Sequence, residues 1–193
     1  MVSMINTVIW ENRTGYNTSY RMRNYGEEYL HYAVPRKNVT DAGIMNTQEI
    51  DRALPHYLWY NTWVGMTRYN SGIDRTLAPE QGTDLVTQLK ALTMWGAYYI
   101  YKEHKLGSLT AGKLADFVVL DRDLLSIPTD DIPNTKTLMT VIGGKAVFVS
   151  NALADEFNTD PVGLSTWPSK PLENRLIFTG PPPIPDYMRA TMQ

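Results

Sequence analysis

The sequence has no cysteine, which excludes disulfide bonds and thiolate metal sites within the chain. It also lacks any apolar run near the roughly 20 residues that a membrane-spanning helix needs. The N-terminal stretch has neither a basic start nor a long apolar centre, so it does not resemble a signal peptide. We therefore expect a cytoplasmic protein without a membrane partner.

An excess of positive charge is missing as well. The chain has 18 Lys and Arg residues and 20 Asp and Glu residues, and its net charge is −2. Nucleic-acid binding needs a cationic surface, so no nucleic-acid partner is expected. The sequence contains no G-x-G-x-x-G, P-loop or G-x-S-x-G motif, which leaves nucleotide binding and serine hydrolysis without support.

Tyrosine and tryptophan, in contrast, are abundant, with twelve and five residues against four phenylalanines. Their side chains join an apolar ring to a polar group, and such residues suit half-buried contact surfaces. The density of these residues indicates a contact surface, although scattered core aromatics are the simpler interpretation of any single one.

Hydrophobic spacing and turn residues predict the elements of the first half. They indicate a strand-and-turn region at 1–30, a helix at 34–41, a strand at 44–51, a helix from 55, a loop at 70–83 and a helix at 84–105. Gly43 is expected to end the first of these helices, and Thr83 to cap the last.

The second half is predicted to contain two β-hairpins. One would join residues 108–109 to residues 117–120, and the other would turn at Gly143-Gly144, where glycine can adopt the positive φ of a tight turn. From Asn151 onward the chain is rich in proline, which favours an extended arm laid over a neighbour.

Three histidines are the first candidates for a metal site. A catalytic zinc ion needs three protein ligands, usually with a closely spaced pair, and the chain has no such pair. His56, shortly after Asp51, is the best ligand candidate, and a surface or packed histidine is the alternative. His104 is interpreted as a cation at a helix C-terminus, and His31 as structural.

Asp51 and Lys113 with Asp116 are the other candidates for chemistry. Asp51 ends the predicted strand at 44–51, which is where a barrel enzyme places its acid–base group, although an exposed loop aspartate is the alternative. Lys113 and Asp116 flank a predicted turn, and turn hydrogen bonds explain both without catalysis.

The stretches "GSLTAGKLADFVVLDRD" (107–123) and "TVIGGKAVF" (140–148) carry a longer pattern. They resemble the C-terminal signature of the amidohydrolase superfamily, in particular amidohydrolase family 3, the branch of N-acyl amino acid and N-substituted formamide hydrolases. The stretch "VTDAGIMNTQEIDRALPHYLWYNTWVGMTRYNSG" (39–72) is similar to the last barrel strand and following helix of that family.

The resemblance implies an α+β fold in two parts. Residues 1–106 would be the last strands and helices of a (β/α)8 barrel, and residues 107–193 a small β-sandwich lobe with an extended Pro-rich tail. It implies hydrolysis of amide or other C–N bonds in a small molecule, with a divalent metal such as zinc. On this alignment Asp51 falls at the metal-binding, proton-shuttling aspartate of the family, and Arg68 falls at a recurrent arginine expected to bind substrate.

Three hypotheses about function follow. The family's H-x-H pair and other metal ligands have no counterpart here, so the first is a truncated hydrolase with weak or no family activity. The second is a non-catalytic fragment that oligomerises, and the third is a metal-independent enzyme that uses a lysine with a carbonyl or pyridoxal cofactor at an oligomer interface. Uncovered strand edges recruit partners, so we expect a homo-oligomer, with its aromatic residues at or near the interface: Trp59, Trp63, Trp95 and Tyr99.

Overall fold

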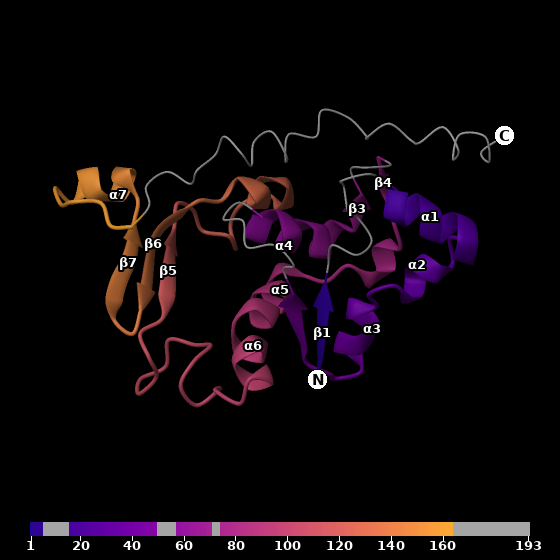
Figure 1. Ribbon diagram of the computed structural model, residues 1–193, viewed down its shortest axis with the longest axis horizontal. Coiled ribbons are helices and arrows are strands. Elements are labelled where there is room, and N and C mark those ends of the chain that lie inside the picture. The colour runs from indigo at the N-terminus through magenta and orange to yellow at the C-terminus, as the bar shows by residue number, and fades with distance from the viewer. Residues whose placement is uncertain (6–15, 50–56, 71–73, 164–193) are drawn as a thin grey trace.

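The computed structural model describes residues 1–5, 16–49, 57–70 and 74–163, and combines helices with three small sheets (Figure 1). The predicted mixture of helices and strands is confirmed. The sheets of the described residues hold two, two and three strands, so they include no closed barrel, and the barrel origin of the first half stays a prediction. No helix in these ranges is long and apolar enough to cross a membrane.

The first part of the chain is organised around a pair of parallel strands. Its elements are β1 (Val2–Ile5), α1 (Tyr16–Tyr25), α2 (Tyr29–Tyr32), α3 (Arg36–Asp41), β2 (Asn46–Glu49) and α4 (Tyr57–Thr67). Strand β1 pairs with β2 in parallel, in a register that runs from Val2 opposite Asn46 to Ile5 opposite Glu49. The pair thus forms a two-stranded parallel sheet, and α4 is the next described helix after β2.

The middle of the chain adds a small hairpin and two short helices. Its elements are β3 (Tyr69–Asn70), β4 (Arg75–Thr76), η2 (Pro79–Gln81), α5 (Leu85–Leu92) and α6 (Met94–Tyr99). Helices α5 and α6 contact β2, and in Figure 1 they lie on one side of the parallel pair while α3 lies on the other. The parallel pair is therefore covered by helices from both earlier and later parts of the chain.

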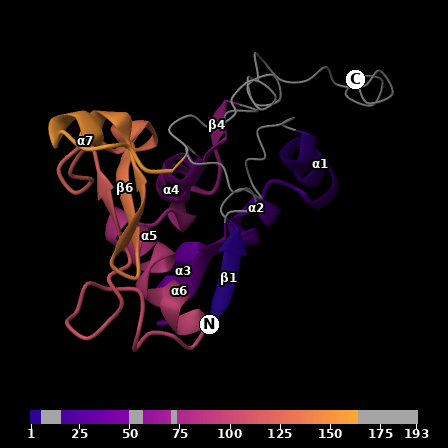
Figure 2. The same cartoon turned by 60° about the vertical axis from the view of Figure 1, so that its left-hand side comes forward.

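The last described part is an antiparallel sheet of three strands. Its elements are β5 (Phe117–Leu120), η3 (Thr129–Asn134), β6 (Thr137–Ile142), β7 (Lys145–Val149) and α7 (Asn151–Glu156), with the strand order β5-β6-β7. This sheet and α1 lie at opposite ends of the molecule in both views (Figures 1 and 2).

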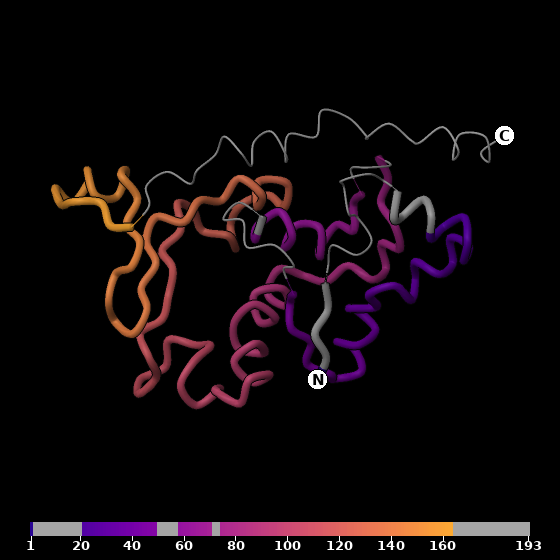
Figure 3. Tube along the Cα trace, viewed as in Figure 1, coloured from indigo at the N-terminus to yellow at the C-terminus, as the bar shows by residue number. Residues whose placement is uncertain are grey.

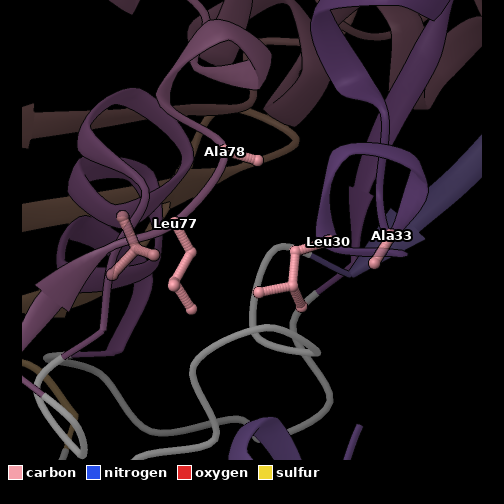
Figure 4. Packing of buried hydrophobic residues seen from close by; sticks show 5 residues of the cluster. Leu30, Ala33, Leu77 and Ala78 are labelled. Atoms are coloured by element: carbon pink, nitrogen blue, oxygen red, sulfur yellow. The ribbon is translucent and has the colours of Figure 1, made fainter. Parts of the chain in front are cut away.

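Three clusters of buried side chains form the core. Leu30 and Ala33 of the α2 region face Leu77 and Ala78 across the first cluster (Figure 4). The third cluster lies between α7 and the three-stranded sheet and includes Leu153.

The second cluster joins the two halves of the chain. It contains Trp59 of α4, Ile132 of η3 and Leu124, which precedes η3 in the chain. The Trp63 indole Nε1 also donates a hydrogen bond of 3.0 Å to Asp130 Oδ1 of η3. The division into parts 1–106 and 107–193 stays a prediction, and these contacts show that residues on its two sides share one apolar cluster.

Several local predictions are confirmed. Gly43, with φ +75°, lies just beyond the end of α3, and α4 follows the strand as expected. The hairpin of β6 and β7 turns at Gly143 and Gly144, whose φ angles are +58° and +79°. Two consecutive residues at positive φ match the tight turns that suit the twist of a hairpin.

The prediction of a first hairpin is wrong. Residues 108–109 form no strand, and β5 pairs with β6 instead, from Phe117 opposite Val141 onward. The reason lies at the turn of the other hairpin, where Asp116 Oδ1 accepts from the Gly143 N–H at 2.6 Å and the Gly144 N–H donates to the Ala115 carbonyl at 3.0 Å. Residues 100–116 form an irregular connection before these contacts (Figure 3).

The long helix predicted over 84–105 is two helices. It breaks at Thr93, with φ −122° and ψ −86°, and α6 ends at Tyr99. The Thr93 hydroxyl donates to the Leu89 carbonyl at 2.7 Å, a side-chain bond that commonly bends helices. The N-cap is Asp84, which accepts from the Thr87 N–H at 2.8 Å, and not Thr83, whose hydroxyl accepts from Gln88 at 2.6 Å.

Three further predictions need correction. Residues 16–25 form α1 rather than strand and turn, and Met22 of this helix packs against the first cluster. The predicted loop at 70–83 contains part of the β3–β4 hairpin. Residues 151–156 form α7, which Ser150 caps by accepting from the Leu153 N–H at 3.3 Å, while residues 164–193 of the predicted arm lie outside the described residues.

Candidate functional site

The carboxyl end of β2 is the candidate site. The strand ends at Glu49, two positions before Asp51, and α4 begins at Tyr57, one position after His56. Asp51 and His56 themselves lie outside the described residues. The structure therefore describes the elements on both sides of the predicted site residues.

Strand β2 is unusual because it is both polar and buried. Its sequence is NTQE, Asn46 is fully buried and Thr47 nearly so. The amide nitrogen and oxygen of Gln48 are also buried, and neither finds a hydrogen-bond partner within the described part of the chain. Parallel strands are usually rich in Val, Ile and Leu, so polar contacts must hold this one in place.

Arg36 of α3 supplies the main polar contact to β2. Arg36 is 1% exposed, and its guanidinium donates through Nη1 to Asn46 Oδ1 and through Nη2 to the Thr47 carbonyl at 3.4 Å. The Asn46 amide completes the arrangement by donating to Thr40 Oγ1 at 2.9 Å. Helix α3 is thus tied to the start of β2 by a side chain whose donors match two acceptors at once.

Asn61 of α4 contacts the other end of the same strand. Its Nδ2 donates to the Glu49 carbonyl at 3.4 Å. Helices α3 and α4 therefore hold the beginning and the end of β2 through side chains that bind main-chain oxygens.

Arg68, the predicted substrate-binding residue, is buried directly after α4. It is 2% exposed, and its Nε, Nη1 and Nη2 donate to the carbonyls of Leu77, Val34 and Ala33, each at 3.3 Å. These contacts join two separate backbone segments, 33–34 and 77, to the residue that follows α4. The role of Arg68 in substrate binding stays a prediction.

Burial lowers the pKa of both Arg36 and Arg68. It lowers the pKa of the Arg36 guanidinium to about 10, and the positive charge of Arg68 adds to the effect. Burial likewise lowers the pKa of Arg68 to about 10, partly opposed by the negative charge of Glu80. Both side chains still carry their charge at neutral pH, which strengthens their hydrogen bonds to carbonyl oxygens.

Lys113 and Asp116, from the signature stretch, serve the architecture as predicted. Lys113 Nζ donates to the Leu106 carbonyl at 3.1 Å, and Asp116 binds the Gly143 N–H of the neighbouring turn. The hypothesis of a lysine with a carbonyl or pyridoxal cofactor would have to use one of the chain's lysines, and among them Lys90, Lys102 and Lys105 are exposed. Exposure does not favour the desolvated lysine that such chemistry requires.

The comparison with protein families decides the ancestry. The model of the amidohydrolase family matches residues 9–148. The chain belongs to the amidohydrolase family. The matched range includes β2, the segment with Asp51, and both signature stretches.

Two individual proteins are similar to this amidohydrolase-family chain. Protein LONG AFTER FAR-RED 3 of Arabidopsis thaliana is 33% identical over 75 residues, which are 39% of this chain and 13% of that protein. The structure of an amidohydrolase from Thermotoga maritima MSB8 matches with a TM-score of 0.42 and 20% identity, over 64% of this chain and 26% of that one. The chain thus spans only a small part of the length of these relatives.

Members of the amidohydrolase family generally depend on a metal, and the described residues do not form a site that fits one. Within 1–5, 16–49, 57–70 and 74–163, no group of three or more His, Cys, Asp or Glu side chains could hold a metal ion. His31 pairs with Glu80 at 2.5 Å, and His104 is exposed beyond the end of α6. No chemical step is therefore assigned to a metal.

Arg36 is the residue that sequence reasoning missed. A usable signal was present, because a strand of sequence NTQE between predicted helices requires polar partners if it is buried. Arg36 reaches β2 because of the turn at Val34 between α2 and α3, and the sequence pattern alone did not specify that turn.

Proposed function

We propose that the chain contributes the C-terminal part of an amidohydrolase-type active site that hydrolyses amide or other C–N bonds in small molecules. Membership of the family supports hydrolytic descent. The single observation that carries the location is β2, a parallel strand that ends two positions before Asp51 and leads into α4. Catalytic residues of such strand–loop–helix units lie at the carboxyl ends of the strands.

In this proposal Asp51 is the acid–base residue. Its carboxylate accepts a proton from water as the water oxygen attacks the carbonyl carbon of the substrate. The proton then passes to the leaving nitrogen as the C–N bond breaks, which leaves a carboxylic acid and an amine. His56 lies in the same connecting segment and is proposed as a further polar group of this site, including as a metal ligand.

The experiment compares turnover of an N-acyl amino acid and of an N-substituted formamide by the full chain, with and without added Zn²⁺. We expect Asp51→Asn to lower turnover by about a hundredfold or more, the range for loss of a general base. Asp41→Asn is the matched control, because Asp41 is exposed and paired only locally with Lys37 at 2.6 Å. Absence of turnover for both substrates, or turnover that Asp51→Asn leaves unchanged, would contradict the proposal.

An assembly role is the second candidate, because several aromatic and apolar side chains near the end of α6 are exposed within the described part of the chain. Tyr98, Tyr99, Ile100 and Tyr101 at the end of α6 are all exposed, Tyr101 by 82%. Trp59, in contrast, is buried within the chain and is not available for such a contact. We propose that this aromatic surface joins copies of the chain in a homo-oligomer.

Light scattering across a wide range of concentration tests the assembly role. We expect an oligomer for the unmodified chain, and a shift toward the monomer for the double variant Tyr99→Ser with Tyr101→Ser. Tyr32→Ser is the control, because Tyr32 is also exposed but lies on α2. A compact monomer at every concentration would exclude this role.

A further inference from the structure

Two buried arginines lie in one continuous series of contacts that leads to β2. Arg68 holds the Ala33–Val34 backbone, and the next charged residue along that backbone, Arg36, holds β2. A main-chain bond links them, since the Arg36 N–H donates to the Val34 carbonyl at 2.8 Å. The same carbonyl also accepts from Arg68 Nη1.

The backbone in the middle of this series is strained. Val34 has φ +57°, a left-handed conformation that β-branched residues rarely adopt. Arg68 itself has φ +59°, and Ala78, next to the Leu77 carbonyl that Arg68 binds, has φ +46°. Such conformations persist only where the surroundings impose them, and here the surroundings include the three-carbonyl contact of Arg68.

The conformation of Val34 determines where Arg36 points. Only Pro35 separates the two residues, so the left-handed turn at Val34 lies two positions before Arg36, the first residue of α3. From there the Arg36 side chain reaches Asn46 and Thr47 at the start of β2. A change of this turn would withdraw the guanidinium from both acceptors.

We propose that Arg68 and Arg36 act in series as positioning residues for β2, and through β2 for the Asp51 segment. Arg68 holds Val34 in its left-handed conformation, that conformation places Arg36, and Arg36 fixes the strand that ends just before Asp51. The importance of this for catalysis rests on the proposed function. The mechanical relation between the two arginines and β2 does not, and it can be tested by itself.

Backbone hydrogen exchange of the full chain measures the relation directly. Lysine keeps the charge of arginine but cannot bind two or three acceptors in fixed geometry. We expect Arg36→Lys to speed exchange at 46–49 by about tenfold, the factor that one charge-assisted hydrogen bond contributes to an equilibrium. Exchange in the hairpin of β6 and β7 should not change, because that hairpin lies outside the series.

Arg68→Lys should act on more of the chain than Arg36→Lys. We expect it to speed exchange both at 33–36 and at 46–49, whereas Arg36→Lys affects 46–49 alone. Arg75→Lys is the matched control, since Arg75 is half exposed and pairs with Glu27 at 2.5 Å, and it should leave both segments unchanged. Unchanged exchange at 46–49 in both Arg36→Lys and Arg68→Lys would overturn the proposal.

A rescue experiment separates positioning from ordinary packing. Glycine adopts positive φ without strain, so Val34→Gly should restore slow exchange at 46–49 in the Arg68→Lys background. If Arg68 served only to pack, the loss of the Val34 side chain would speed exchange further, and that result would contradict the series. Asn46→Ser provides a milder variant should Arg36→Lys fail to fold, and it too should speed exchange at 46–49.

Kinetics complete the test where the chain turns over a substrate. Positioning predicts that Arg36→Lys and Arg68→Lys lower kcat and leave KM unchanged. A raised KM for Arg68→Lys with normal exchange at 46–49 would make Arg68 a substrate-binding residue and overturn the proposal. Without turnover the proposed hydrolysis fails, while the exchange experiments still decide whether the two arginines hold β2.

Discussion

Asp116 Oδ1 accepts a hydrogen bond of 2.6 Å from the backbone N–H of Gly143, 27 positions later in the chain. This bond joins the two signature stretches of the sequence, the first around Gly112 and Lys113 and the second at Gly143 and Gly144. It explains why an aspartate precedes β5 and why a glycine pair turns between β6 and β7. The signature residues Lys113 and Asp116 therefore make contacts that support the fold, and Asp116 holds the three-stranded sheet together.

Removal of this bond should weaken the three-stranded sheet. We expect Asp116→Ala to lower the free energy of unfolding by about 1 kcal/mol, the usual value of such a hydrogen bond. Asp116→Asn retains an oxygen acceptor and should lower it by less. Chemical denaturation measures both, with Asp155→Asn on the exposed side of α7 as the control, and equal effects of all three variants would contradict this reading of the signature.

Alanine substitutions at Gly107 and Gly112 can separate the cost of backbone strain from the cost of a steric clash. Both have positive φ, +86° and +91°, but a Cβ at Gly107 would lie 2.8 Å from Ala97 Cβ, whereas one at Gly112 would meet nothing within 4 Å. We expect Gly112→Ala to lower the free energy of unfolding by about 1 kcal/mol through strain alone. Gly107→Ala should lower it by about 2 kcal/mol or more, because α6 must also move away.

Denaturation of the two alanine variants provides the measurement. The difference between them isolates the contact of Gly107 with α6. If Gly107→Ala proved no more destabilising than Gly112→Ala, the close approach of this connection to α6 would be wrong.

The free energy of unfolding of the chain should depend on pH through Asp121. Hydrogen bonds from Arg122 lower the pKa of this carboxyl from 3.8 to about 2, with help from the Lys136 N–H. Because the pKa is lower in the folded state, the stabilisation is complete above about pH 4 and is lost as the pH falls toward 2. Asp121→Asn should therefore remove part of the decline in stability over this range.

Unfolding measured at several pH values between about 5 and 2 tests that prediction. The quantity to compare is the slope of the unfolding free energy against pH in the parent chain and in Asp121→Asn. Asp123→Asn is a neighbouring control that lacks the Arg122 contact. Identical slopes in the parent chain and Asp121→Asn would contradict the assignment.

The cluster around Trp59 should make the two halves unfold together. Ile132 of η3 is 1% exposed and packs beside Trp59 of α4, so Ile132→Ala should lower the free energy of unfolding by about 2–5 kcal/mol. Leu125→Ala is the control, since Leu125 is 69% exposed.

The number of unfolding transitions tests whether the two parts of the chain unfold together. We expect one transition, detected at the same denaturant concentration by tryptophan fluorescence and by circular dichroism, in the parent chain and in Ile132→Ala. Two separated transitions would indicate that residues 1–106 and 107–193 fold independently.

Sequence alone was sufficient where a feature depends on a few neighbouring residues. The glycine pair of the second hairpin, the end of α3 at Gly43 and the helix after β2 all follow from local preferences for turns and helical spacing. The family signature was equally visible, because it is a contiguous string of residues, and the match over 9–148 agrees with it.

The tertiary structure decided what depends on residues far apart in the chain. The partner of β5 was set by the bond from Gly143 to Asp116, which lie 27 positions apart. The burial of Arg36 and Arg68 could not be read from their neighbours, since an isolated arginine is expected at the surface. Both are inside because folding brings main-chain carbonyls to them, and those oxygens come from segments that meet only in the folded chain.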